Sequence, residues 1–310
     1  MLIDLSIIIV SWKVRDLLEQ CLLSIYKETK DLTFEVIVVD NASGDGTLEM
    51  LHRFVETRHG ASLQNDASKI QNGILKIIPS AENLGFAKGN NVGIKMATGK
   101  YILLLNPDTV VLDRSLENSV LYLEKNSQYQ VLGCKLLYPD GSLQESCRRF
   151  PGFLDQSLVL LKLHNFFPKS GPIGRYYMKD FKYDRVREVD QLMGAFILAK
   201  REVFDTIGLL DERFFAWFEE VDWCLRAKNA GYKIIFYPDA SIVHYKGQSF
   251  NQYGRRQFLF DRSLLLYFQK HASFMAWMGL SLLVPFNLML DWAFRMMRRA
   301  GIVVKKKKNL

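Results

Sequence analysis

Three short apolar runs in the first third of the chain restrict its fold more than any other feature. They are LSIIIV at residues 5–10, EVIVVD at 35–40 and KYILLLN at 100–106. Each run is apolar on both of its alternating faces, which is typical of strands buried on both sides in a parallel sheet. The runs therefore predict a largely parallel central sheet whose two faces are covered by other elements.

Helical periodicity fills the intervals between these runs. Apolar side chains recur at intervals of three and four residues, at Leu17, Leu18, Cys21, Leu22 and Ile25 and then at Leu48, Leu51 and Phe54. Strands that alternate with helices are the signature of the α/β class. Residues 57–73 and 131–190 are irregular or broken by proline and glycine, so we expect loops and short elements there.

Composition places the chain among globular proteins and draws attention to its C-terminus. The 310 residues are 49% hydrophobic and 24% charged, which is enough to bury the core of one large domain or two ordinary ones. The net charge is +8, and cations concentrate in the last sixteen residues, at Arg295, Arg298, Arg299 and Lys305–Lys308. This concentration indicates an anionic surface as a partner of the C-terminus.

The cysteines and the N-terminus bear on the compartment. Four cysteines lie far apart without a C-x-x-C pair, which disfavours a thiolate zinc site and favours a reducing compartment. The N-terminus carries Asp4 and no basic segment, so we expect no signal peptide.

Polar turns follow the second and third apolar runs. VVDNASGDGT at 38–47 presents Asp40, and LLLNPDT at 103–109 presents Asp108 after Asn106. Ligands of open α/β sheets bind at the carboxyl ends of strands. A carboxylate there can accept hydrogen bonds from a nucleobase or ribose, or bind Mg²⁺ or Mn²⁺ together with phosphate oxygens. Either stretch can also be an ordinary turn or helix cap.

The segment NLGFAKGNNVGI at 83–94 combines three glycines with Lys88, a cation that could meet a phosphate. It contains neither the G-x-G-x-x-G dinucleotide fingerprint nor a P-loop, which disfavours a nicotinamide-dependent oxidoreductase. A glycine-containing helix entry is the alternative interpretation.

The segment FAWFEEVDWCLR at 215–226 holds acids among large aromatic side chains. If it is helical, Asp222 and Arg226 form a favourable i,i+4 pair. A carboxyl in a partly dry environment has a raised pKa and suits a general base, although acids in a first helical turn also simply suit the helix dipole. Further along, His244 in SIVHYKG at 241–247 is either a metal ligand or a structural histidine.

The order of these motifs closely resembles that of family 2 glycosyltransferases with the GT-A fold. The resemblance starts at a first strand that ends at Ser11, continues to VHYKG and covers about residues 1–247. Within the family the sequence is most similar to bacterial rhamnosyltransferases of cell-surface polysaccharide assembly. The resemblance implies a Rossmann-like GT-A domain at 1–247, with a mostly parallel sheet flanked by helices. For residues 248–310 we expect a C-terminal helical, membrane-associating segment, because this region holds an apolar stretch and the concentrated cations.

The resemblance also implies an activity. It is the transfer of a sugar, with inversion, from a nucleotide-sugar donor to a glycan or a polyprenyl-diphosphate-linked acceptor, assisted by Mg²⁺ or Mn²⁺. The donor that it favours is dTDP-rhamnose, and no nucleic-acid partner is expected. A catalytically decayed, membrane-bound scaffold of a polysaccharide assembly complex is the alternative, although the intact acidic motifs argue against it.

The family's residue roles carry over onto this sequence position by position. Asp108 stands at the last position of the D-x-D motif and binds metal with His244, while Asn106 replaces the first Asp. Glu220, the second acid of a pair, is the expected catalytic base, and Asp222 is the second candidate. The nucleotide-sugar site comprises Ser11, Asp40, Asn83, Lys88, Asn106 and Asp108, with Asp40 contacting the base.

The apolar stretch from Ala272 to Leu290 approaches the roughly 20 residues that span a bilayer as a helix. Pro285 interrupts it, and cations flank both ends, so the charges give no clear orientation. We therefore expect an interfacial helix or a bent re-entrant pair on an anionic membrane surface, on the cytoplasmic face of a bacterial inner membrane. A buried core helix followed by a solvated basic tail is the alternative.

Overall fold

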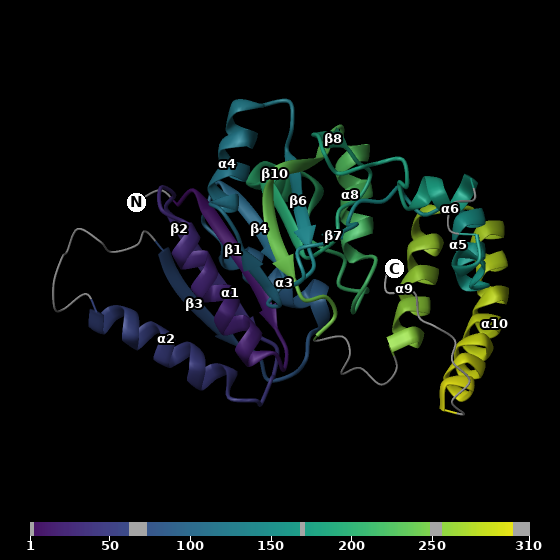
Figure 1. Ribbon diagram of the computed structural model, residues 1–310, viewed down its shortest axis with the longest axis horizontal. Helices are drawn as coiled ribbons and strands as arrows, with labels where there is room; N and C mark the ends of the chain where they lie inside the picture. The colour runs from purple at the N-terminus through teal and green to yellow at the C-terminus, as the bar shows by residue number, and fades with distance from the viewer. Residues whose placement is uncertain (1–2, 62–72, 168–170, 249–255, 300–310) are drawn as a thin grey trace. The chain divides into compact units, whose positions relative to one another are not determined.

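Figure 1 shows the computed structural model, which describes residues 3–61, 73–167, 171–248 and 256–299. The chain forms two compact units. One combines residues 1–148 with 181–254, and the other combines residues 149–180 with 255–310.

The first unit is built on one mixed sheet. Its strands are β1 (Leu5–Ser11), β2 (Phe34–Asp40), β3 (Gly73–Pro79), β4 (Tyr101–Leu105), β5 (Thr109–Val111), β6 (Val131–Leu137), β7 (Leu143–Gln144), β8 (Arg187–Glu188), β9 (Phe196–Lys200) and β10 (Ile234–His244). Their order is β3-β2-β1-β4-β9-β6-β10-β5, with β7 paired to β6 and β8 to β10. Along this path β9 and β5 run antiparallel to their neighbours and the other strands run parallel, as the sequence predicted.

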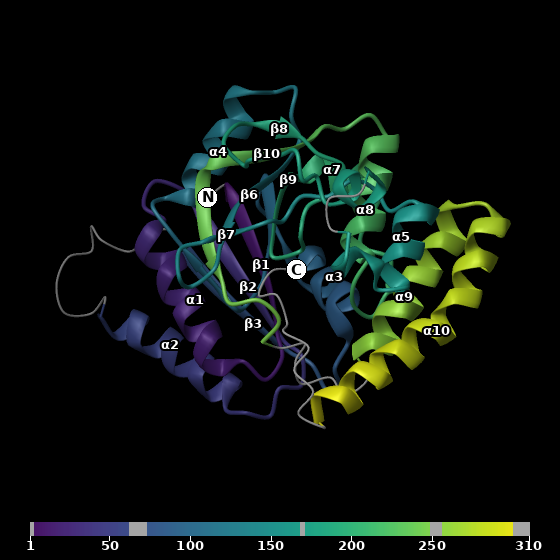
Figure 2. The same ribbon diagram turned by 45° about the vertical axis from the view of Figure 1, so that its right-hand side comes forward.

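The helices of the first unit are α1 (Arg15–Glu28), α2 (Thr47–Ala61), α3 (Gly85–Met96), α4 (Ser115–Lys125), α7 (Arg201–Ile207) and α8 (Glu219–Asn229). Helices α1 and α2 lie on one face of the sheet and α3 on the other (Figures 1 and 2). Right-handed crossovers require helices on both faces. The strands β2 and β3 lie on one side of β1 in the sheet, and β4 lies on the other side. The predicted apolar faces of α1 and α2 are largely buried, with Leu18, Cys21, Leu22, Ile25, Leu51 and Phe54 in the core.

Sheet register gathers the predicted site residues at one edge. Ser11 and Asp40 are paired at the ends of the parallel strands β1 and β2. Thr109 of β5 pairs with His244 of β10, so the residue before Thr109 also lies beside His244. The carboxyl ends of β1, β2 and β10 and the amino end of β5 therefore provide these residues.

The expectation of loops and short elements at 131–190 was wrong for β6, which is an interior strand of the sheet. Its sequence VLGCKLL is interrupted by Gly133 and Lys135, which hides the apolar pattern. Gly133 is needed for packing, because a Cβ there would come within 2.3 Å of the Leu192 side chain. Helix α2 also continues to Ala61 and β3 begins at Gly73, so only part of the expected loop at 57–73 remains, at residues that lie outside those described.

The second unit is helical. It contains α5 (Phe153–Leu160), the 3₁₀ helix η1 (Leu163–Asn165), α6 (Gly171–Tyr176), α9 (Arg256–His271) and α10 (Phe274–Arg299). Helix α10 packs against both α5 and α9. The compact units therefore divide the chain differently from the expected ranges 1–247 and 248–310, because residues 149–180 belong with the C-terminal helices.

Helix α10 continues through Pro285, although we expected this proline to interrupt the apolar stretch. The residues that follow are held by packing, since Asn287 is buried against α9. Tertiary contacts of this kind offset the backbone hydrogen bond that a proline removes.

Candidate functional site

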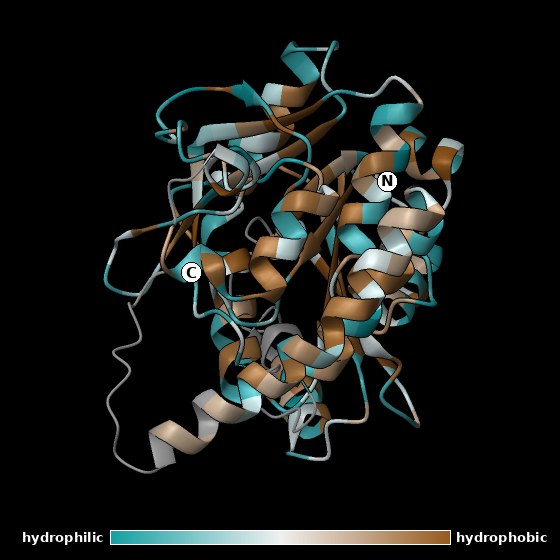
Figure 3. Cartoon of the chain, turned by 90° about the vertical axis from the view of Figure 1, so that its right-hand side faces the viewer, coloured by the Kyte–Doolittle hydropathy of each residue, from teal (hydrophilic) through white to brown (hydrophobic). Residues whose placement is uncertain are grey.

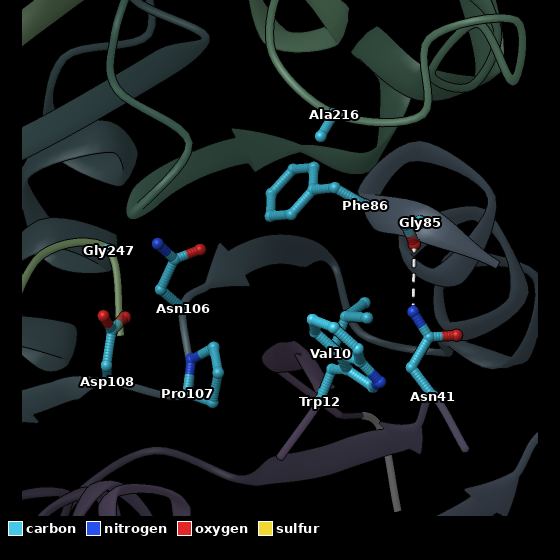
Figure 4. Close-up of a pocket in the computed structure, with 10 residues that line it drawn as sticks. All are labelled: Val10, Trp12, Asn41, Gly85, Phe86, Asn106, Pro107, Asp108, Ala216 and Gly247. Atoms are coloured by element: carbon cyan, nitrogen blue, oxygen red, sulfur yellow. Dashed lines mark hydrogen bonds between the residues drawn. The ribbon is translucent and has the colours of Figure 1, made fainter. Parts of the chain in front are cut away.

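A pocket opens at the carboxyl ends of β1, β2 and β4. Its lining residues are Val10, Trp12, Asn41, Gly85, Phe86, Asn106, Pro107, Asp108, Ala216 and Gly247. In Figure 4, Asn106 and Asp108 lie on one side of the pocket, Asn41 on the other, and Trp12 with Val10 between them. The space between protein atoms at this pocket is about 500 Å³, part of it open to solvent.

Asn106 and Asp108 line this pocket, and His244 lies next to both of them. One carboxylate oxygen of Asp108 lies 3.4 Å from Nε2 of His244, and the amide nitrogen of Asn106 lies 3.3 Å from the same Nε2. Asp108 and His244 are almost fully buried, with relative exposures of 4% and 3%. The three side chains converge although they come from two distant segments of the chain.

Gln144, which the sequence did not single out, orients the ring of His244. Its amide nitrogen donates to the backbone oxygen of His244 over 3.2 Å, which turns its amide oxygen toward Nδ1 of the ring, 2.7 Å away. Since that oxygen can only accept, Nδ1 carries the proton in the neutral ring. The lone pair of Nε2 therefore points toward Asp108 and Asn106.

This arrangement fits a divalent cation. A carboxylate oxygen and an unprotonated imidazole nitrogen 3.4 Å apart can bind the same ion, and the Gln144 contact is the outer-shell support that metal-binding histidines usually have. Among the described residues no three His, Cys, Asp or Glu side chains form a metal-binding group. Asp108 and His244 would therefore hold the ion together with oxygens from a ligand or water.

Asp40 and Ser11 present buried polar atoms at the ends of their strands. Within the described residues, Oδ1 of Asp40 and Oγ of Ser11 have no hydrogen-bond partner. Burial raises the pKa of Asp40, and hydrogen bonds from Ser43 act in the opposite direction. An unpartnered buried acceptor is costly, so a ligand donor at this strand end would be favourable.

Asn83 shapes the loop before α3. Its side-chain oxygen accepts hydrogen bonds from Nδ2 of Asn41 at 2.8 Å and from the backbone N–H of Gly85 at 2.9 Å. Asn41 in turn accepts a hydrogen bond from the N–H of Leu84 at 2.8 Å. Asn83 thus acts on the pocket through Asn41 and Gly85, which do line it.

Lys88 does not line the pocket. It lies on the exposed side of α3, with its ammonium 3.9 Å from the carboxylate of Glu82. This geometry gives no support to its expected phosphate contact.

Gly85 couples the pocket to the acidic segment. Its φ is +76°, and a Cβ there would lie 2.4 Å from the backbone oxygen of Phe215. That oxygen also accepts a hydrogen bond from the N–H of Phe86 at 2.8 Å. The start of α3 therefore fixes the segment that leads into α8, and Ala216 of this segment lines the pocket.

The predicted helix in the acidic segment is present as α8, and its entry is unusual. Trp217 and Phe218 both have left-handed backbone, with φ of 63° and 68°. For bulky side chains this conformation is rare, and such residues cluster at functional sites. The entry brings Glu219 and Glu220 to the first turn of α8.

The two glutamates of α8 lie in dry surroundings. Glu219 is buried and Glu220 is half-buried. In each side chain, Oε2 is inaccessible to solvent and has no hydrogen-bond partner within the described residues. Desolvation raises the pKa of Glu220, while the charge of Arg148 acts against this rise. Desolvation, together with the charge of Glu220, raises the pKa of Glu219 well above its usual range.

Asp222 has different surroundings. It is fully buried, and it accepts a 2.9 Å hydrogen bond from Nε of Arg226 in the predicted i,i+4 pair. The same guanidinium donates to the backbone oxygens of Ile207 and Leu209. This ion pair ties α8 to the end of α7, which favours a structural role for Asp222 and leaves Glu220 as the better candidate for a base.

The sequence also missed Trp12, Phe86 and Gly247 as pocket residues. Trp12 had a readable signal, because it directly follows Ser11, where the first strand was expected to end. Phe86 and Gly247 lie inside motifs that were recognised for other residues. Gln144 had no such signal, since it comes from a two-residue strand in an irregular region.

Comparisons with known proteins agree with this geometry. The profile of "Glycosyl transferase family 2" matches residues 6–208. An N-acetylglucosaminyl-diphospho-decaprenol L-rhamnosyltransferase of Mycobacterium tuberculosis is 25% identical over 256 residues, covering 79% of this chain and 77% of the relative. The rhamnosyltransferase WbbL of Escherichia coli K12 is 28% identical over 171 residues, covering 52% and 61%.

Among solved structures, the mannosyltransferase PcManGT from Pyrobaculum calidifontis, in complex with GDP-Man and Mn²⁺, is similar with a TM-score of 0.57. The similarity covers 99% of this chain and 77% of that structure at 20% sequence identity, and it shows the GT-A fold. Because the family profile covers about two thirds of the sequence and the fold agrees with it, the chain belongs to glycosyl transferase family 2 and is similar to bacterial rhamnosyltransferases.

Proposed function

We propose that the protein transfers rhamnose from dTDP-rhamnose, with inversion, to a glycan or polyprenyl-diphosphate-linked acceptor. The observation that carries the proposal is the convergence of Asp108, Asn106 and His244 at a pocket, with the His244 ring oriented by Gln144. This arrangement supports the binding of a metal–diphosphate group at the carboxyl edge of the sheet.

A divalent ion held by Asp108 and His244 would offset the negative charge that develops on the departing nucleoside diphosphate. The Mn²⁺ in the complex of the mannosyltransferase PcManGT supports this choice of ion. Asp40, with its unpartnered Oδ1, is the proposed acceptor for a donor group on the nucleoside. Trp12 provides an aromatic surface in the same pocket.

The proposed base is Glu220. It takes the proton of the acceptor hydroxyl while the hydroxyl oxygen bonds to the anomeric carbon and the bond from that carbon to the diphosphate breaks. Attack from the face opposite the leaving group inverts the anomeric centre. A raised pKa suits this task, because a base works best when its pKa approaches the working pH.

The names of the relatives support the choice of sugar and acceptor. Two of them are rhamnosyltransferases, and the mycobacterial name includes a decaprenol diphosphate carrier. A lipid-linked acceptor calls for an enzyme at the cytoplasmic face of a membrane, in a bacterium the inner membrane. The 20-residue apolar segment Phe274–Ala293, which is long enough to cross a bilayer, and the basic C-terminal residues support such a location.

The test is a panel of nucleotide sugars, scored by nucleoside diphosphate released with and without Mn²⁺. The proposal expects metal-dependent release from dTDP-rhamnose that the Glu220→Gln variant loses. Release only from another donor would overturn the sugar assignment, and no release from any donor with lipid-linked or glycan acceptors would favour a scaffold. For the location, recovery of the full-length chain in the soluble fraction at low salt without detergent would contradict membrane attachment.

A further inference from the structure

Helix α10 has an apolar exposed face. Among the residues of α10 whose side chains the structure describes, the exposed ones are Pro285 and the large apolar residues Phe274, Met275, Leu282, Phe286, Leu288, Met289, Trp292 and Met296. Leu282 is 67% exposed and Trp292 is 64% exposed. Most residues of this helix are coloured as hydrophobic in Figure 3.

The exposed residues form a continuous stripe. Met275, Leu282, Met289 and Met296 are spaced seven residues apart, so they lie on one face of the helix at intervals of about two turns. Phe286 and Trp292 flank this line. We call these six residues the apolar stripe.

The opposite face of α10 carries polar contacts to α9. Asn287 is 1% exposed and donates through Nδ2 to both carboxylate oxygens of Asp261, each over 2.9 Å. Gln257 donates to the same carboxylate over 2.9 Å. The buried Leu280, seven residues before Asn287, lies on the same inward face. A helix that faces water shows the reverse arrangement, with polar residues outward.

The inverted arrangement is the one expected where the outer surroundings are lipid, since polar groups in membrane-embedded helices face protein partners. Helix α9, to which α10 is bound, restricts how α10 can be oriented relative to a membrane. Helix α9 carries Arg256, Arg262 and Lys270, and these cations cannot lie in the hydrocarbon core. Because Asn287 and Asp261 hold α10 to α9, a crossing of the bilayer by α10 would draw the cations of α9 toward the hydrocarbon core at a large cost in free energy.

We propose that the apolar stripe inserts into one leaflet of an anionic membrane with α10 parallel to the membrane plane. The occupant of this face is lipid, because the stripe is continued in the sequence by the cations Arg298, Arg299 and Lys305–Lys308, which are complementary to anionic headgroups. The proposal rests on the membrane attachment proposed above and specifies the face and its orientation.

The experiment measures insertion depth at four positions. Single substitutions Met275→Cys, Leu282→Cys, Met289→Cys and Met296→Cys in the full-length chain carry an environment-sensitive fluorophore, and the four native cysteines are buried. Vesicles of phosphatidylglycerol and phosphatidylcholine contain quenchers at fixed acyl-chain depths. The matched control is Leu23→Cys in α1, an exposed apolar residue of the first unit at 51%.

In-plane insertion predicts similar, shallow depths at all four positions and no insertion at Leu23→Cys. A membrane-spanning helix would instead change depth by up to about 10 Å between successive positions, from the rise of seven residues, and that gradient would overturn the proposal. If the labels are shielded from water without vesicles and the chain sediments as a dimer, the apolar stripe binds a second copy of the chain. That result would also overturn the proposal. Vesicle binding without label insertion would refute the stripe while leaving membrane attachment, through the basic residues, intact.

Discussion

Both carboxylate oxygens of Asp108 make contacts, so the charge and the shape of this side chain can be tested separately. One of its carboxylate oxygens faces His244, and the other accepts a 3.4 Å hydrogen bond from the N–H of Gln248. Asp108→Asn removes the charge and keeps the shape. We expect it to weaken Mn²⁺ binding and lower kcat by about 10²-fold or more, with little change in thermal stability.

Titration with Mn²⁺ followed by electron paramagnetic resonance, together with turnover, checks this expectation. Asp113→Asn is the control, because Asp113 lies beyond the other end of β5 and is exposed. Near-normal turnover of Asp108→Asn with full metal dependence would remove Asp108 from the metal site.

Gln144 provides a test of the His244 tautomer. Gln144→Leu removes the acceptor that fixes Nδ1, so we expect Mn²⁺ affinity to fall by about 10- to 100-fold. Gln144→Glu keeps an acceptor for Nδ1 but loses the amide that donates to the backbone oxygen of His244, so it should retain more affinity than Gln144→Leu. Equal affinities for the two variants, measured by the same titration, would show that the contact does not orient the ring.

We expect Glu220 to control the catalytic rate and Asp222 to control the stability of the fold. Glu220→Gln removes the base, so we expect kcat to fall by about 10²–10⁴-fold with donor binding kept. Since burial raises the pKa of Glu220, the wild-type rate should rise with pH through a pKa above the ordinary glutamate range, and the variant should lack this rise.

Asp222→Asn leaves the guanidinium of Arg226 without its carboxylate and should destabilise the fold by about 3 kcal/mol while the pH profile of the rate is kept. Thermal melts and pH–rate profiles separate the two effects. An inactive, stable Asp222→Asn beside an active Glu220→Gln would exchange the two roles.

The candidate site residues that the sequence singled out are those whose neighbours in the chain carry information. Asn106, Asp108 and Glu220 each lie next to an apolar run or an aromatic cluster, and the motif order pointed to His244. Gln144 could not be found this way, because its contact with His244 depends on the pairing of β7 with β6 and of β6 with β10.

At the scale of elements, the close approach of α3 to the segment before α8 can be tested at one glycine. Gly85→Ala introduces both a strained φ of +76° and a Cβ 2.4 Å from a backbone oxygen. We expect lowered stability and lowered kcat, because Ala216 and the entry to α8 must move. Gly141→Ala is matched for strain, with φ of +80° and nothing within 4 Å of the added Cβ.

Strain alone should destabilise each variant by about 1–2 kcal/mol. The excess loss in Gly85→Ala, measured by denaturant unfolding and turnover, reports the clash. Equal losses in the two variants would indicate that the contact with Phe215 relaxes without consequence.

The contact between α9 and α10 should make stability depend on pH. Burial raises the pKa of Asp261 from 3.8 to about 6, so the folded state binds more protons than the unfolded state between these values. Its free energy of unfolding should therefore fall as pH rises from about 4 to about 6, by up to about 3 kcal/mol. Asp261→Asn should remove this part of the slope.

Other groups near Asp261 also titrate, so the difference between wild type and variant is the quantity to measure. Lys162 and Asp291 act on Asp261 through their charges, and burial together with the charge of Lys162 lowers the pKa of His164. Denaturant unfolding at pH 4.5 and pH 7 provides the comparison. A wild-type slope that Asp261→Asn retains would assign the pH dependence to these other groups.

Elements were predictable where hydrophobic periodicity was uninterrupted. Strands β1, β2 and β4 and helices α1 and α2 follow directly from apolar spacing. Strand β6 was not predicted, because Gly133 and Lys135 interrupt its apolar pattern. Helix α10 extends past Pro285 because its contacts with α9 are tertiary, and local sequence does not report them.

At the scale of the whole molecule, the two compact units are interleaved along the chain. The chain leaves the first unit after Arg148, returns at Phe181 and leaves again after Gly254. No single cut separates the units, and removal of residues 272–310 would take α10 from the helices that pack against it. Point substitutions on the full-length chain are therefore the appropriate way to separate membrane attachment from catalysis.

The pairing of β5 with β10 has a consequence for how the protein is made. Asp108 is synthesised early, whereas His244 and the strand that holds it emerge from the ribosome much later. At translation rates of about 5–20 residues per second, the nascent chain carries one half of the proposed ion site for several seconds or longer. The first strands can pair during this time, but the proposed ion site is complete only when β10 joins the sheet. Catalytic competence is thus a late event in biosynthesis, and a chain that stalls before β10 would present a partly formed sheet without activity.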